Sequence, residues 1–121
     1  MVKLFAFLHR NPELTHDEFV THWRERHGPL IAGIPELARY LVRYEQHPRH
    51  QPDNPLSAAD DLDGVAVQWL RSIDDFFAFA SEPAYQEIVA PDELRFLDMS
   101  RVRYVICEEP NVVIDGPTSD R

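Results

Sequence analysis

Cysteine is almost absent from this 121-residue chain, in which Cys107 stands alone. One cysteine cannot close a disulfide within the chain or build a thiolate metal cluster. It ends the apolar run Tyr104-Val105-Ile106-Cys107, which is typical of a buried strand, where a thiol is usually an inert small hydrophobic group. We therefore expect neither a disulfide framework nor a cysteine nucleophile.

Positive charge is also scarce, with 12 Lys and Arg against 21 Asp and Glu and a formal net charge of -9. Such a surface repels nucleic-acid phosphates and anionic lipid head groups. No apolar run approaches the roughly 20 residues of a membrane-spanning helix, and residues 1–10 lack the basic start and cleavage site of a signal peptide. We expect a cytoplasmic protein that binds neither nucleic acid nor membranes.

Glycine is rare as well, and the chain has no glycine-rich phosphate loop and no G-x-S-x-G elbow. Histidine is better represented, but its spacing argues against a metal site. His22 and His27 lie five residues apart, about 140° round an α-helix, and His16 and His22 lie six apart. His47 and His50 fall in a proline-rich segment. We therefore expect no metal and no cofactor.

Four apolar segments of strand length are present, at residues 2–9, 37–46, 64–70 and 102–107. Between the first two, Thr15 and Glu18 form a capping box, which predicts a helix from residue 16. Phe19, Trp23 and His27 follow at intervals of four, so this helix has one buried stripe. The pair Gly28-Pro29 predicts its end or a break.

A second helix is predicted after residue 72, where Ser72 to Asp75 is a start signal and phenylalanines follow at helical spacing. Pro91 begins a further short helical stretch to residue 97. The acidic residues at 60–61, Asp63 and the pair Asp74-Asp75 are interpreted as solvated starts of a strand and a helix. The proline-rich segment 47–61 is predicted to be a long loop.

The order strand, helix, strand, strand, helix, strand predicts an α+β fold, a ferredoxin-like βαββαβ sandwich with its helices on one face of the sheet. Segments 2–9 and 64–70 are apolar on both faces, so the face without helices needs a cover. A second copy of the chain is the economical cover, which predicts a homodimer that forms a dimeric α/β barrel. We assign residues 1–109 to this domain and residues 110–121 to a tail that contacts the partner subunit.

The first quarter of the chain contains FLHRNPELT (residues 7–15), then Phe19 and Trp23, then HGPL (residues 27–30). This pattern resembles the EthD-like family of dimeric α/β-barrel proteins. The resemblance implies a homodimeric ferredoxin-like barrel. Such proteins occur in bacterial catabolic clusters and, in fungal relatives, as polyketide tailoring enzymes that decarboxylate or dehydrate aromatic substrates without a cofactor. The resemblance also implies that the family's histidine at the helix end corresponds to His27.

His27 is the leading catalytic candidate. It closes the apolar stripe of the first helix, so its ring should point between helix and sheet, where the pocket of this fold lies. An imidazole there can take or give a proton near neutral pH. The structural alternative is a helix-end histidine that interacts with unpaired carbonyls.

Aromatic residues supply the expected pocket wall, because their faces hold planar ligands and phenol hydroxyls orient polar groups. Tyr40 is the preferred second catalytic group. The remaining substrate-binding candidates are Phe7, Trp23, Tyr44, Tyr85 and, as a weaker case at the end of the first strand, His9.

The leading functional hypothesis is a cofactor-independent, lyase-like enzyme that decarboxylates, dehydrates or moves a proton on a hydrophobic aromatic or polyketide-type molecule. The alternative is a non-catalytic ligand-binding or accessory protein of a catabolic pathway. A haem-dependent or oxygenase role comes third, because the resemblance implies a superfamily that also includes haem-dependent enzymes and cofactor-free monooxygenases.

Overall fold

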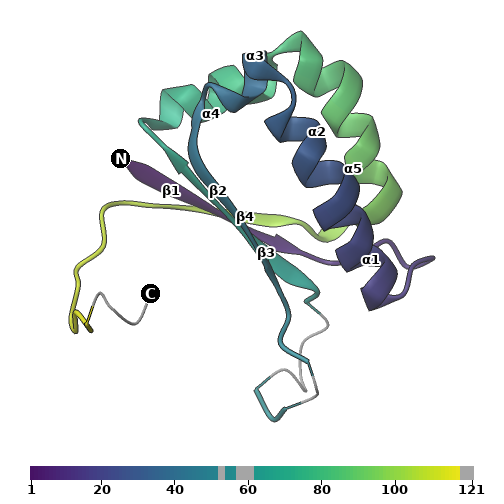
Figure 1. Cartoon of the computed structure of the whole chain (residues 1–121), viewed down its shortest axis with the longest axis horizontal. Helices are drawn as coiled ribbons and strands as arrows, with labels where there is room; N and C mark the ends of the chain where they lie inside the picture. Colours follow the sequence, from purple (N-terminus) through teal and green to yellow (C-terminus); the bar gives the residue numbers. More distant parts are fainter. Residues whose placement is uncertain (52–53, 57–61, 118–121) are drawn as a thin grey trace.

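The computed structural model describes residues 1–51, 54–56 and 62–117. Within them, four strands form one antiparallel sheet in the order β2-β3-β1-β4 (Figure 1). The strands are β1 (Val2–Leu8), β2 (Leu41–Pro48), β3 (Gly64–Leu70) and β4 (Arg103–Cys107). Strands β1 and β3 lie at the centre of the sheet, which agrees with their apolar character on both faces.

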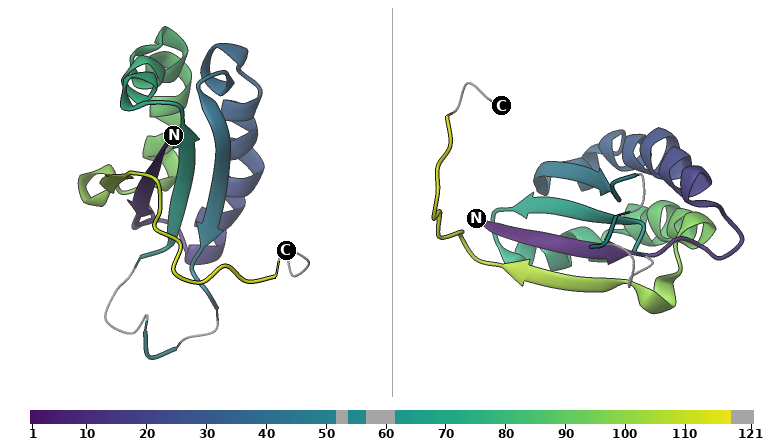
Figure 2. Two further views of the ribbon diagram at one scale, coloured as in Figure 1. Left: turned by 90° about the vertical axis from the view of Figure 1, so that its left-hand side faces the viewer. Right: turned by 90° about the horizontal axis from the view of Figure 1, so that it is seen from below.

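Two helical runs connect the strands and pack on the same face of the sheet (Figures 1 and 2). The first consists of α1 (His16–His22), the π-helical η1 (Trp23–His27), α2 (Gly28–Ala32) and α3 (Pro35–Ala38). The second consists of α4 (Ile73–Ser81), the π-helical η2 (Tyr85–Val89) and α5 (Ala90–Phe96), and a 3-10 turn, η3 (Met99–Arg101), leads into β4. This order confirms the predicted ferredoxin-like βαββαβ fold.

The predicted helix starts are confirmed. The Thr15 hydroxyl accepts a hydrogen bond from the Glu18 amide at 3.1 Å, and the Glu18 carboxylate accepts one from the Thr15 amide at 2.9 Å. Ser72 likewise accepts from the amide of Asp75. These caps satisfy backbone donors that the first helical turn leaves free, so short local sequences were enough to locate both starts.

Of the two outcomes predicted at Gly28-Pro29, the helix end is wrong, because the chain stays helical as far as Ala32, but the regular α-helix is interrupted here by the π-helical η1. The amide of Gly28 donates to the carbonyl of Trp23, five residues back, so the turn before Pro29 is wider than an α-helical turn. A proline removes one backbone donor, and a π-helical turn is one way for a helix to accommodate it. The second run repeats this pattern, with an Ala90 to Tyr85 bond just before Pro91.

The predicted second strand begins too early. Residues 35–38 are helical, and β2 starts at Leu41 with a register shift between Leu41 and Arg43. Pro35 at the start of α3 favours the helix, and Leu37 is fully buried as part of it. Tyr40 therefore lies in the turn before the strand and not on a strand face.

Asp63 is also placed differently from the prediction of a solvated strand start, since it is fully buried. Its carboxylate accepts hydrogen bonds from the Arg10 amide at 2.8 Å and the Arg10 guanidinium at 3.1 Å, and it pairs with His16 Nδ1 at 2.7 Å. This cluster connects the segment after β1 and the start of α1 to the residue before β3. The acidic residues at 60–61 lie outside the described residues.

The sheet face opposite the helices, the outer face, is covered by no helix or strand among the described residues. At the centre of this face, Phe5 of β1 lies between its strand partners Val67 of β3 and Val105 of β4. Nearby, the Lys3 ammonium lies 5.0 Å from the centroid of the Trp69 ring. Strand β4 is largely exposed, contrary to the prediction of a buried strand, because it is an edge strand. The described part of the tail leaves on this open side, away from the helices, and Val113 and Ile114 are exposed (Figures 1 and 2).

Among the described residues, no helix is both long and apolar enough to cross a membrane.

Candidate functional site

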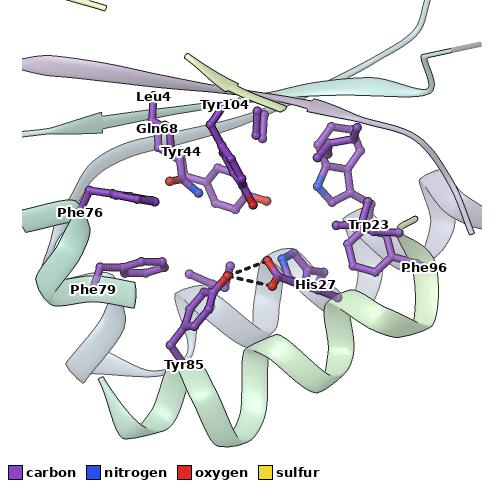
Figure 3. Close-up of a pocket in the computed structure, with 16 residues that line it drawn as sticks. Leu4, Trp23, His27, Tyr44, Gln68, Phe76, Phe79, Tyr85, Phe96 and Tyr104 are labelled. Carbon is purple, nitrogen blue, oxygen red and sulfur yellow. Dashed lines mark hydrogen bonds between the residues drawn. The ribbon is translucent and has the colours of Figure 1, made fainter. Parts of the chain in front are cut away.

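A cavity of about 60 Å³ lies between the sheet and the helices, with room for a few water molecules (Figure 3). Its walls are mainly apolar and aromatic, as in small-molecule sites. Its polar groups come from both layers. The helices contribute His27, Tyr85 and Glu93, and the sheet contributes Tyr44, Gln68 and Tyr104.

His27 is buried, with 4% of its surface exposed, and is held from behind by Asp92. Its Nδ1 lies 2.9 Å from one carboxylate oxygen of Asp92, and Nε2 of His22 lies 2.9 Å from the other. Burial lowers the pKa of His27, and its contact with Asp92 opposes this only in part. The imidazole is therefore neutral at neutral pH. Since a carboxylate only accepts, Nδ1 carries the hydrogen, and Nε2 keeps its lone pair for the cavity.

Asp92 stays ionised in this arrangement. Burial acts to raise its pKa, but hydrogen bonds from His27 and His22 together outweigh burial and lower the pKa below the usual value. A carboxylate behind an imidazole sets its tautomer and ring orientation, as in many enzymes that use histidine as a base.

The π-helical segment η1 brings His22 and His27 to the same carboxylate. In an α-helix, residues five apart point about 140° away from each other, so the spacing argument made from the sequence assumed the wrong helix. A π-helical turn takes up one more residue, and residues five apart then lie on one side. The pair is nevertheless not part of a larger ligand set, since no group of three or more His, Cys, Asp or Glu side chains among the described residues is arranged to hold a metal ion.

Glu93 is next to Asp92 in the chain, but its pKa is shifted in the opposite direction. Burial, aided by the nearby Asp92 charge, raises its pKa to about 7, although a hydrogen bond from Tyr85 opposes this. The Tyr85 hydroxyl lies 2.8 and 2.9 Å from the two carboxylate oxygens (dashed lines in Figure 3). Burial and the Glu93 charge raise the pKa of Tyr85, so the phenol keeps its proton. Glu93 therefore holds a proton at a higher pH than an ordinary glutamate does.

The sheet side of the cavity carries two phenols. Tyr44 accepts a hydrogen bond from Gln46 at 3.2 Å, and burial raises its pKa. Burial followed by the Glu93 charge raises the pKa of Tyr104, which extends from β4 toward the helices (Figure 3). Both phenols therefore remain hydrogen-bond donors at neutral pH.

Four of the residues selected from the sequence lie together around this cavity: Trp23, His27, Tyr44 and Tyr85. Trp23 and Phe96 close the end opposite Phe76 and Phe79, as Figure 3 shows.

Three other selected residues lie elsewhere. The Tyr40 hydroxyl donates to Glu82 at 2.8 Å and accepts from Arg39 at 2.9 Å, so it belongs to a surface cluster at the end of α4. Phe7 points to the opposite sheet face because the helix-facing residues of β1 are even-numbered. His9 lines a groove with Phe7 and Arg103 on that outer side.

Sequence reasoning missed Asp92, Glu93, Gln68 and Tyr104. Asp92 and Glu93 follow Pro91 in the first turn of α5, where acidic residues are common. Their residue type at this position therefore gave no indication of contacts with remote side chains. Gln68 did carry a signal, because it is the polar residue of the otherwise apolar strand β3. Tyr104 lies in the exposed edge strand, and alternation along β4 places it on the helix side opposite Ala6.

Both the family model and the curated relatives that match this chain carry the name EthD or dehydratase. A family model described as EthD domain matches residues 11–100. The chain is 29% identical over 101 residues to the conidial pigment biosynthesis dehydratase EthD of Metarhizium robertsii, a match that covers 76% of this chain and 70% of that protein. It is 27% identical over 124 residues to the dehydratase aurZ of Gibberella zeae, covering 96% and 82%.

Solved structures with the same fold include an EthD family protein from Bacillus halodurans, with a TM-score of 0.66 and 20% identity over 91% of this chain and 99% of the other. A dimeric protein of unknown function and ferredoxin-like fold from Bacteroides fragilis has a TM-score of 0.65 and 12% identity, covering 89% and 95%. At these identities the structures support the fold, and some of the neighbours are described as dimeric.

Proposed function

Since the chain belongs to the EthD family, we propose that it is a cofactor-independent, lyase-like enzyme that removes water from a hydrophobic aromatic or polyketide-type molecule. The observation that carries this proposal is one cavity that holds two proton-transfer groups with opposite pKa shifts. His27 is neutral and oriented by Asp92, and Glu93 has a pKa of about 7. Paired groups whose pKa values are shifted in this way are typical of an acid and a base.

In the proposed reaction, Nε2 of His27 removes a proton from the carbon next to a carbonyl group of the substrate. Protonated Glu93 donates its proton to the departing hydroxyl as the carbon–oxygen bond breaks, so one double bond and one water molecule form. Tyr44 and Tyr104 donate hydrogen bonds to the oxygen that gains negative charge. Transfer of the proton from His27 to Glu93 then restores both groups. The names of the two dehydratase relatives favour loss of water over the other lyase reactions.

Substrate entry requires movement of side chains, because about 60 Å³ is less than the roughly 150 Å³ of a cavity known to hold benzene. Tyr104 and Phe76 line the cavity and also reach solvent, so we assign the entrance to them. The remaining walls are mainly apolar and aromatic, and closure around a substrate would strengthen the electrostatic contacts inside.

We further propose that two copies pack through their open sheet faces as a homodimer. The support is the set of apolar residues, such as Val105, that stay exposed on the outer face of the described chain, together with the dimeric state named for some structural neighbours. Residues 110–117 leave on this side and include exposed Val113 and Ile114, so we assign the tail to the partner subunit's surface.

His27→Ala tests the reaction. Hydroxylated polyketide-type aromatic ketones serve as substrates, and loss of one water is followed by mass spectrometry. Turnover should fall by roughly 10²- to 10⁴-fold while ligand binding persists, because a general base contributes about that much. Circular dichroism checks that the variant folds.

His22→Ala is the matched control, because His22 also bonds Asp92 but does not line the cavity. Its turnover should fall far less. Tyr40→Phe should leave turnover unchanged. Normal turnover by His27→Ala would exclude His27 as the base, and a wild-type protein that binds these ligands without changing them would support the accessory-protein alternative.

A further inference from the structure

Gln68 lies on the helix-facing side of β3, at the middle of the sheet. Its strand neighbours on that side, Ala66 and Leu70, are buried and apolar. In register it lies between Leu4 of β1 and Tyr44 of β2. The side chain lines the cavity and approaches it from the side opposite His27 and Tyr85 (Figure 3). An amide is therefore placed where packing alone would favour a branched apolar residue.

The amide oxygen Oε1 of Gln68 is buried, and no group among the described residues donates a hydrogen bond to it. A buried acceptor without a donor destabilises a fold, so such groups are rare and need an explanation.

Gln46 on the adjacent strand shows the contrast. Its Nε2 donates to the carbonyl of Trp23 at 2.9 Å and to the Tyr44 hydroxyl at 3.2 Å. The hydrogen bonds of Gln46 thus explain why an amide stands at that position. The described contacts give no such explanation for the amide oxygen of Gln68.

We propose that Gln68 selects ligands that carry a hydroxyl group on the edge facing the sheet, apart from the group that reacts beside His27. A hydroxyl fits this position because it donates to Oε1 and can also accept from the amide nitrogen. A site with an unpaired polar group discriminates strongly against analogues that lack the matching group. The inference rests on the proposed function, because it requires that the cavity binds an aromatic molecule. It restricts the class of ligands to aromatic molecules that carry a hydroxyl group.

Phenol and toluene are suitable probes, because they have nearly the same shape and differ in one hydroxyl. Titrations of the full chain followed by NMR should show that phenol binds about tenfold more tightly than toluene. In Gln68→Leu this preference should disappear. Equal affinity of the wild type for both probes would overturn the role of Gln68 and leave the proposed function standing. Binding of neither probe would overturn both.

Thermal unfolding without ligand gives an independent readout. Gln68→Leu removes a buried unpaired acceptor, so its midpoint should rise by about 4 °C or more. Gln46→Leu is the matched control, and its midpoint should fall because two hydrogen bonds are lost. A lower midpoint for Gln68→Leu would mean that the amide has a structural partner, and the inference would be wrong.

Discussion

The helix-facing side of the sheet and its opposite side are built from the same strands, but they differ in what they bury. On the helix side, Leu4 and Leu70 are 2% and 0% exposed, and the cavity interrupts this packing with polar groups. On the other side Val105 is 47% exposed although its strand neighbours are apolar. The first face is covered by the helices and lines the cavity, whereas the second leaves apolar residues such as Val105 exposed among the described residues, and such a surface is typical of an interaction site.

The largest expected effect concerns the outer face. Val105→Lys places a charge at the proposed dimer interface, where it would be buried without a partner. Dissociation should become easier by roughly 10³-fold, because an uncompensated buried charge costs about 3–5 kcal/mol. Sedimentation measurements should then show the mass of one chain in place of two.

Ile88→Lys is the matched control for this change, since Ile88 is 44% exposed but lies in η2 of the helix layer. It should leave the dimer intact. Equal dissociation of both variants, or a wild-type protein that is monomeric at micromolar concentration, would contradict the assignment of the outer face.

A smaller effect is expected inside the helix face, at Glu93. Its pKa is raised from 4.5 to about 7 in the folded protein, so the fold binds this proton more tightly than the unfolded chain does. The resulting stability is present below pH 4.5 and is lost as pH rises through about 7, by at most about 3 kcal/mol.

Glu93→Gln keeps the shape of the side chain and removes its titration. The variant should lack this part of the pH dependence of the unfolding free energy between pH 4.5 and 7, as measured by denaturant titration at several pH values. Glu87→Gln, at an exposed position of η2, should behave as the wild type does. Identical pH profiles for Glu93→Gln and the wild type would show that Glu93 titrates normally.

The smallest of these effects concerns the packing between β3 and η1. A Cβ atom added to Gly64 would lie 2.6 Å from Cζ3 of Trp23, too close without a shift of the ring that closes the cavity. Gly64→Ala should therefore lower the free energy of unfolding by about 1–3 kcal/mol. Gly116→Ala in the tail, where no atom lies within 4 Å, should have no effect. Equal unfolding midpoints for the two variants would mean that Trp23 is free to move.

Much of the fold could be predicted from local patterns. Thr15 and Glu18 located the first helix because a capping box is made by residues three apart, and the apolar strands gave the βαββαβ order. The start of β2 could not be located in this way, since Leu37 and Tyr40 suit a strand by their residue type. Packing of Leu37 into the helix layer, and Pro35 before it, placed this segment in a helix instead.

The candidate site likewise has a part that local sequence patterns predict and a part that they do not. The position of His27 at the end of an apolar stripe was enough to direct its ring between helix and sheet, where it is buried. The partner that sets its protonation was not predictable, because Asp92 lies 65 residues away in the chain and meets His22 and His27 only through the π-helical turn. A hydrogen-bond partner at that distance leaves no local pattern in the sequence.

By itself, the sequence determined the order of the elements, the helix starts and the two apolar faces of the central strands, since capping, periodicity and strand alternation act over a few residues. Only the tertiary structure decided that Asp92 stays ionised while Glu93 beside it has a pKa of about 7. The physical reason is that desolvation and hydrogen bonding depend on which remote side chains surround a group. Two adjacent carboxylates on one helix can therefore lie in opposite environments.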